Sequence, residues 1–265
     1  LGFLDFAGSI VVHTVGASVA LAGVIVIGPR RGRFNPAKAK KFRPSDMGYS
    51  VLGIFILWFA WWGFNGGSNL AYDDNVSFII LNTNLAGAFA GLTGFVHAYY
   101  VDRQNTYVKL AGSVLGGLVA ITACCNMVSP VSSIIICMVA GLVHNYAFDL
   151  LIKLRLDDPV GAIPVHGACG IWGAMALGIF GLSDQLAAGG RMEQIGVQAL
   201  GVVMAVAFAG GVSYLFFKIM NQAVGLRVNL QQEDEGYDLE KEPESKPKRK
   251  SKKDTDDKQS GLFSF

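Results

Sequence analysis

The segments Asp-Phe-Ala-Gly-Ser-Ile-Val-Val-His (residues 5–13) and Asp-Pro-Val-Gly-Ala-Ile-Pro-Val-His (residues 158–166) share one frame, Asp-x-x-Gly-x-x-x-Val-His. The two copies lie 153 residues apart, and each leads into an apolar stretch. One short frame of this kind would be weak evidence. Two copies that both end in a histidine, a residue rare inside membrane spans, indicate an internal repeat.

The composition indicates a membrane protein with a polar tail. Hydrophobic residues make up 52% of the 265 positions, and nine of the 22 basic and ten of the 20 acidic residues follow Met220. We therefore expect a transmembrane core over residues 1–220 and a partly disordered cytoplasmic tail over residues 221–265. The small basic surface of the core excludes a nucleic-acid-binding domain.

Seven stretches are apolar enough to cross the hydrocarbon core, which needs about 20 residues per helix. We predict an all-α integral membrane protein with seven transmembrane helices, the fourth of them short and bounded by Lys109. The predicted spans are residues 6–28, 48–66, 76–101, 110–126, 131–152, 162–182 and 194–220. The four cysteines lack metal-ligand spacing and are interpreted as packing residues, so no metal or cofactor is expected. They are Cys124, Cys125, Cys137 and Cys169.

Basic residues gather in alternate loops. The loop Pro29–Asp46 holds seven, the loops Asp102–Lys109 and Lys153–Asp158 add four, and the intervening loops hold only Arg191. The positive-inside rule predicts that the basic loops and the C-terminus are cytoplasmic and that this chain starts outside.

The two copies lie on the first and sixth predicted spans, so they run in opposite directions, as in the inverted repeats of many transporters. Asp5 and Asp158 stand eight residues before their histidines, which is about 12 Å of helix if each aspartate is an N-cap. We therefore expect His13 and His166 to meet near the bilayer midplane, although Pro164 should kink the second helix or delay its start. A complete first repeat would need four further spans, so we expect that this chain is a fragment.

Polar residues inside a membrane are costly and are usually functional. His13 and His166 are therefore the candidate site, with a packed pair of core histidines as the alternative. His97 and His144 lack the motif and are interpreted as structural residues.

These motifs resemble those of the ammonium transporter, methylammonium permease and Rhesus family. Residues Asp5–His13 resemble its fifth-span signature, Trp61–Ser68 its sixth and Asp157–Gly173 its tenth, while Gly225–Val228 and Glu235–Asp238 resemble its C-terminal regulatory segment. The resemblance covers residues 1 to about 240, corresponding to spans five to eleven of an 11-helix inverted-repeat fold.

The resemblance implies a homotrimer in the plasma membrane with one narrow pore per subunit, which carries ammonium, ammonia or methylammonium and is not an enzyme. It assigns the pore proton relay to His13 and His166, a pore gate to Phe64, and ammonium recruitment to Ser68 with Trp61. A cytoplasmic regulator is a candidate partner of the tail. Trp58 and Trp62 are interpreted as members of an interfacial aromatic belt.

Two positions depart from the family pattern. Gly161 replaces an acidic residue that many members carry, and Pro164 replaces a commonly small residue, which predicts an altered inner vestibule. The lysine-rich stretch after Glu242 also lies outside the shared pattern and is a candidate for binding anionic lipid or a regulator.

Ammonium resembles potassium in size and charge, but only ammonium can release a proton. An imidazole pair can exchange that proton near neutral pH and would share at most one, while neutral ammonia crosses the apolar section. One alternative is an ammonium sensor that signals through its tail. Another is a membrane haem protein with two histidine ligands, which close helix packing around His166 disfavours.

Overall fold

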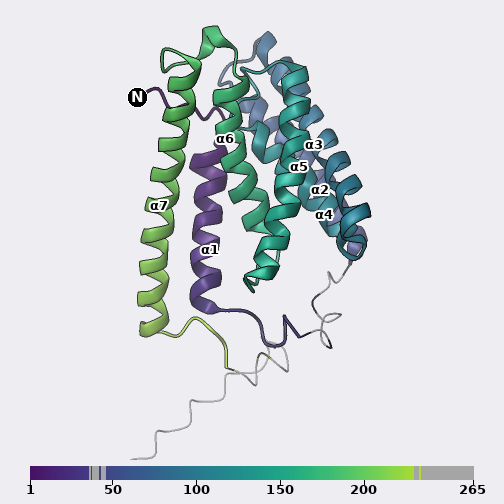
Figure 1. Ribbon diagram of the computed structural model, residues 1–265, viewed down its shortest axis with the longest axis vertical. Helices are drawn as coiled ribbons and strands as arrows, with labels where there is room; N and C mark the ends of the chain where they lie inside the picture. Colours follow the sequence, from purple (N-terminus) through teal and green to yellow (C-terminus); the bar gives the residue numbers. More distant parts are fainter. Residues whose placement is uncertain (36, 38–41, 43–45, 230–232, 234–265) are drawn as a thin grey trace, which may run out of the picture. The chain divides into compact units, whose positions relative to one another are not determined.

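The computed structural model describes residues 1–35, 37, 42, 46–229 and 233, and every regular element in these ranges is helical (Figure 1). The prediction of an all-α chain is therefore confirmed. Two π-helical segments, Ser9–Thr14 and Ile163–Ala168, lead directly into α1 and α6. The α-helices are α1 Val15–Ile27, α2 Met47–Gly67, α3 Asp74–Val101, α4 Thr106–Ile121, α5 Pro130–Lys153, α6 Cys169–Phe180 and α7 Arg191–Ala223.

Six helices of the described chain are long and apolar enough to cross a membrane, rather than the seven we predicted. The six are α2, α3, α5 and α7, together with the continuous helices Ser9–Ile27 and Ile163–Phe180. The exception, α4, has 16 residues and ends at Ile121. The buried segment 122–129 that follows is irregular, and such backbone is tolerated at membrane depth only when protein surrounds it.

Lys109 does not end a loop as expected, because it lies inside α4 and is fully buried. Its Nζ lies 2.9 Å from Asp102 Oδ2 and 2.7 Å from Asp149 Oδ1. Two carboxylates at this distance stabilise a charge that would otherwise be costly to bury. The ion pairs tie the start of α4 to the ends of α3 and α5.

A polar network joins α3, α4 and α5 one helical turn after Lys109. From α4, Ser113 Oγ donates to Asn145 Oδ1 at 3.3 Å. Asn145 Nδ2 donates to the carbonyl of Gly94 at 2.8 Å, and its Oδ1 lies 3.1 Å from the Nδ1 of the buried His144. The same amide nitrogen lies 3.2 Å from His97 Nδ1. Both histidines thus have hydrogen-bonding partners within this network. The four cysteines are buried and form no disulfide bond.

The helix α1 runs antiparallel to α6 and lies beside α7 (Figure 1). Two fully buried glutamines of α7 fasten the first residues of the chain to this pair. Gln198 accepts from Leu4 N at 2.9 Å and donates to Leu4 O at 2.7 Å, while Gln194 donates to Gly2 O at 2.9 Å. The segment that leads to His13 is therefore held by hydrogen bonds.

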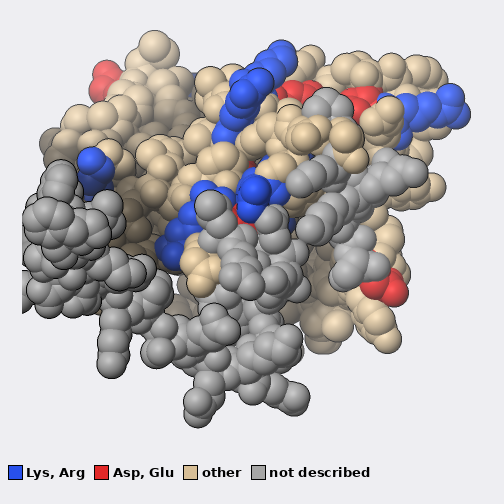
Figure 2. Space-filling model, turned by 90° about the horizontal axis from the view of Figure 1, so that it is seen from below, with Lys and Arg blue, Asp and Glu red and all other residues tan. Residues whose placement is uncertain are grey.

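The described parts of the basic loops lie at one end of the helices, opposite the chain start (Figure 1). Seen from that end, Lys and Arg side chains are spread across the surface, with a few acidic ones (Figure 2).

Residues Leu1–Arg227 form one compact unit. Helix α7 continues three residues beyond the boundary at 220 that we expected. The expectations for Glu235–Asp238 and for the stretch after Glu242 lie outside the described residues.

The Gln198→Leu variant should lower the stability of the protein by about 1–3 kcal/mol, because it leaves Leu4 N and Leu4 O without their partner in a partly buried site. The measurement is thermal unfolding in detergent. Gln222→Leu, at an exposed position of the same helix, is the control and should change the melting temperature little. Equal melting temperatures for both variants would contradict the anchoring role of Gln198.

Candidate functional site

Both copies of the repeat form a π-helical segment, an uncommon conformation that often occurs at functional sites. A glycine with positive φ precedes the segment in each copy: Gly8 has φ of 101° and Gly161 has φ of 73°. Glycine adopts this conformation without the penalty that a Cβ brings. The glycine at 161, noted as a departure from the family pattern, therefore suits its backbone.

The carboxylates of Asp5 and Asp158 accept hydrogen bonds from backbone N–H groups at the starts of these helices. Neither aspartate is the N-cap residue, because the N-caps are Gly8 and Ala162. Asp5 Oδ2 accepts from Ile10 N at 2.9 Å and from Val11 N at 3.0 Å. The N-cap assignment behind our depth estimate was therefore wrong.

In the second copy, Asp158 Oδ2 accepts from Ile163 N at 2.7 Å, and Oδ1 accepts from Gly161 N at 3.0 Å. Pro164 lies at the second position of the helix, where its missing N–H leaves no hydrogen bond unmade. Of the two effects expected of this proline, the delayed start is the one observed, because the helix begins five residues after Asp158.

The structure brings His13 and His166 together. Their ring centroids lie 5.2 Å apart with an interplanar angle of 19°, which is a stacked arrangement. His13 Nε2 and His166 Nδ1 are buried and have no hydrogen-bond partner among the described residues. Each ring thus has a nitrogen available to a small polar molecule.

Two aromatic rings of α2 complete the surroundings of His13. Trp61 stacks on it at 5.2 Å with an angle of 22°, and the Phe64 ring lies 5.5 Å from it. Trp61 and Phe64 are themselves 5.6 Å apart. Trp61 is buried and Phe64 is 41% exposed, so the cluster opens on the Phe64 side.

Ser68 and Trp61, which we grouped for ammonium recruitment, are not brought together. Seven residues of helix separate them, or about 10 Å along the axis. Ser68 caps α2 and donates to Phe64 O at 2.8 Å, whereas Trp61 lies beside the imidazole of His13. Trp58 packs against Gly87 of α3.

Sequence reasoning missed Thr122, the residue that holds the indole of Trp61. Its Oγ1 accepts the Trp61 Nε1–H at 3.0 Å, and both residues are buried. The only signal in the sequence is a single threonine in an apolar run, which is too common to be informative.

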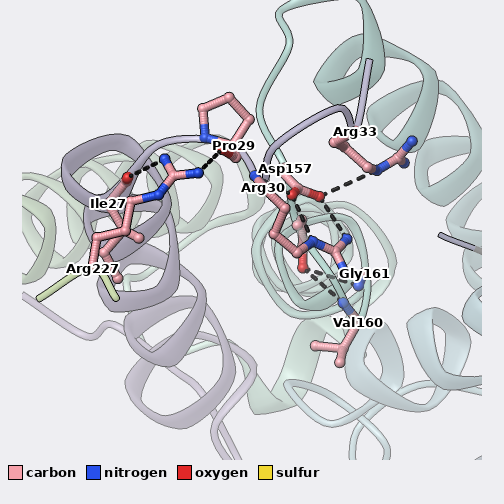
Figure 3. A network of polar contacts seen from close by, with 9 residues as sticks. Ile27, Pro29, Arg30, Arg33, Asp157, Val160, Gly161 and Arg227 are labelled. Carbon is pink, nitrogen blue, oxygen red and sulfur yellow. Dashed lines mark hydrogen bonds and ion pairs between the residues drawn. The ribbon is translucent and has the colours of Figure 1, made fainter. Parts of the chain in front are cut away.

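Sequence reasoning also missed the ion pair between Arg30, which follows α1, and Asp157, which precedes the helix of His166 (Figure 3). Asp157, directly before Asp158, is contacted at 2.8 Å by both Nε and Nη2 of Arg30, and by Arg33 Nε at 3.2 Å. Burial alone would raise the pKa of Asp157, but the hydrogen bonds and charge of Arg30, with the charge of Arg33, hold that pKa below its ordinary value.

Arg227 makes a further contact at this end (Figure 3). Its guanidinium donates to Ile27 O at 3.2 Å and to Pro29 O at 2.8 Å. Arg227, four residues after α7, therefore lies against the end of the helix that carries His13.

Gly161→Ala should lower stability by about 1–2 kcal/mol through backbone strain. Gly8→Ala should cost more, because its Cβ would also lie 2.6 Å from Val12 Cγ2. Gly210→Ala, in an α7 position with open space among the described residues, is the control and should be neutral or stabilising. Chemical denaturation checks the ranking, and a Gly8 variant as stable as the Gly210 variant would contradict it.

Acid should weaken the clamp between Arg30 and Asp157. A carboxyl with a depressed folded-state pKa contributes stability above its unfolded pKa, and this contribution is lost as the pH falls through the folded pKa. We expect Asp157→Asn to cost about 1–2 kcal/mol at neutral pH, since the half-exposed Arg30 is partly screened.

The measurement is the melting temperature between neutral pH and about pH 3. The difference between wild type and Asp157→Asn should shrink as the pH falls below about 4. Asp184→Asn, at an exposed position between α6 and α7, is the control. A constant difference between wild type and Asp157→Asn would contradict the assignment.

Comparisons with known proteins identify the family of the chain. The model of the Ammonium Transporter Family matches residues 1–246. The ammonium transporter Amt2 of Archaeoglobus fulgidus is 40% identical over 251 residues, covering 90% of this chain and 54% of that protein. This chain spans about half the length of such curated relatives.

Solved structures show the same likeness. A structure titled sensor Amt protein has a TM-score of 0.84 and 40% identity, covering 89% of this chain and 59% of that one. Candida albicans Mep2 has a TM-score of 0.77 and 28% identity, covering 87% and 54%. With a family model that matches nearly the whole described chain, this protein belongs to the ammonium transporter family.

Proposed function

We propose that this chain forms part of the conducting core of an ammonium transporter, in which His13 and His166 relay a proton. The observation that carries the proposal is the stacked imidazole pair with two buried nitrogens, His13 Nε2 and His166 Nδ1, that have no partner among the described residues. A buried polar atom without a partner indicates a ligand or water at that place.

The relay explains selectivity. In the proposed step, the lone pair of an imidazole nitrogen takes a proton from ammonium, so that one N–H bond breaks and another forms. Ammonia keeps its electron pair and passes through the apolar section as a neutral molecule, then takes up a proton on the far side. Potassium has no proton to give and would have to cross dehydrated, which is costly in an apolar passage.

The side chains of α2 provide the approach to the relay. Ser68, Phe64 and Trp61 follow one another along the helix from its capped end, and the last two lie 5.5 and 5.2 Å from the ring of His13. The hydroxyl of Ser68 donates its hydrogen to Phe64 O, so the lone pairs of its oxygen remain to accept a hydrogen bond from ammonium. Aromatic faces attract a cation, so Phe64 serves as the gate and Trp61 as the inner wall of the recruitment path.

We further propose that the complete protein is a homotrimer in the plasma membrane, with the start of this chain outside and its C-terminus in the cytoplasm. The Lys and Arg side chains on the face that Figure 2 shows support this orientation. The tail is the proposed contact for a cytoplasmic regulator.

An ammonium sensor is the second candidate, because the structure titled sensor Amt protein has a TM-score of 0.84 to this chain. A sensor would use the same rings to hold ammonium but would not let it pass. The contact of Arg227 with the end of α1 offers such a protein a connection between the helix of His13 and a residue just after the end of α7.

The test is uptake of labelled methylammonium by cells that express the protein from its complete coding sequence. We expect His13→Ala and His166→Ala each to reduce methylammonium uptake at least tenfold or to let potassium pass, because the proton acceptor is lost. His97→Ala, which leaves the site intact, is the control. Unchanged flux and unchanged selectivity in both site variants would contradict the relay. Binding of ammonium by the wild type without any flux would favour the sensor.

A further inference from the structure

Thr122 joins two parts of the site that come from distant segments of the chain. It is the fully buried C-cap residue of α4. Its hydroxyl donates to Leu118 O at 2.6 Å and accepts the indole N–H of Trp61 at 3.0 Å. Because the hydroxyl hydrogen is used by Leu118, its lone pairs remain for the indole, which can only donate. The two bonds therefore fix each other's direction.

The backbone of the same region holds the segment that leads to His13. Ala7 N donates to Thr122 O at 2.9 Å, and Phe6 N donates to Ala123 O at 3.0 Å. Ser9 Oγ donates to Val119 O at 2.7 Å. The last carbonyls of a helix are left free to accept from other groups, and this segment uses one carbonyl of the last turn of α4 and the carbonyls of the two residues that follow the helix.

The side chain of Thr122 thus holds Trp61, while its carbonyl holds the residues directly before the helix of His13. The rings of Trp61 and His13 lie 5.2 Å apart. The positions of both therefore depend on hydrogen bonds that Thr122 makes. Without the hydroxyl, the indole keeps its packing but loses its hydrogen bond to Thr122 and can rotate about its side-chain torsions. The spacing between the indole and the imidazole then depends on packing alone.

We propose that Thr122 is a positioning residue of the ammonium site: it sets the distance of the Trp61 ring from His13 and so the affinity of the site for the cation. This inference rests on the proposed function. An aromatic face attracts a cation that lies within about 6 Å of the ring centroid, so the attraction at the His13 site depends on where the indole ring lies. The substrate should therefore bind more weakly when the indole is released, while the relay nitrogens stay in place.

The experiment compares Thr122→Val, which removes the hydroxyl, with Thr122→Ser, which keeps it, in the protein expressed from its complete coding sequence. Thr93→Val is the matched control, because Thr93 donates to Phe89 O at 2.8 Å in the same backward pattern. We expect Thr122→Val to raise the KM for methylammonium about three- to tenfold, the effect of one hydrogen bond, with the maximal rate changed less than about twofold. Thr122→Ser and Thr93→Val should resemble wild type.

A double-mutant cycle with Trp61→Phe isolates the bond. In a chain that lacks the indole N–H, Thr122→Val should have little further effect on KM. Additive effects of the two substitutions, or a KM in Thr122→Val equal to that of wild type, would overturn the proposal. If Thr122→Val yields no folded protein, Thr122→Cys replaces it, because a thiol is a weak acceptor and should raise KM in the same direction.

A readout that does not need transport separates this proposal from the function it rests on. The indole N–H band of Trp61 in ultraviolet resonance Raman spectra, assigned by subtracting the Trp61→Phe spectrum, should shift in Thr122→Val and not in Thr122→Ser. If the wild type carries no methylammonium, the transport function fails, and the dissociation constant for ammonium chloride takes the place of KM. An unchanged dissociation constant in Thr122→Val would then overturn the positioning role.

Discussion

The imidazole of His13 lies in a packed helical body against Trp61, Phe64 and His166, and the rest of the unit is arranged around that contact. Burying a polar ring costs free energy unless its neighbours satisfy or shield it. Here two rings stack on His13 at 5.2 Å, one from α2 and one from the second copy of the repeat. The contact therefore requires three separate segments to keep a fixed register in depth. Thr122 binds two of them, the side chain of Trp61 and the backbone before His13.

Backbone polar groups provide most of this anchoring. In a lipid environment an unpaired N–H or C=O is costly, so irregular chain at membrane depth must be paired within the protein. The segment after α4 follows this rule: Asn82 Nδ2 donates to Cys125 O and Val128 O at 2.9 Å, and Leu182 N donates to Met127 O at 2.9 Å. A short helix that ends inside the body thus becomes a source of carbonyls. The segment before His13 uses them, and so the weakest predicted span is a support of the site.

The two copies of the repeat reach the same ring contact by related means. Each has a left-handed glycine, a carboxylate that accepts from the first N–H groups of the helix, and a π-helical segment that contains the histidine. They differ at the basic end, where Arg30 at the end of the first helix binds Asp157 at the start of the second. This ion pair joins the C-terminal end of the first helix to the N-terminal end of the second, while the imidazoles meet within the body.

The helical class, the apolar helices and the antiparallel repeat could all be predicted, because apolar length, loop charge and a repeated frame are local properties of a chain in lipid. The place of Lys109 could not, since a lysine at the edge of a span looks like loop until Asp102 and Asp149 arrive from other helices. Trp61 and Thr122 are 61 residues apart, and Arg30 and Asp157 are 127 apart. Nothing in either neighbourhood distinguishes these residues from ordinary polar or aromatic ones. Their roles come from packing that sets each beside a distant partner, and that depends on the register of whole helices rather than on any short pattern.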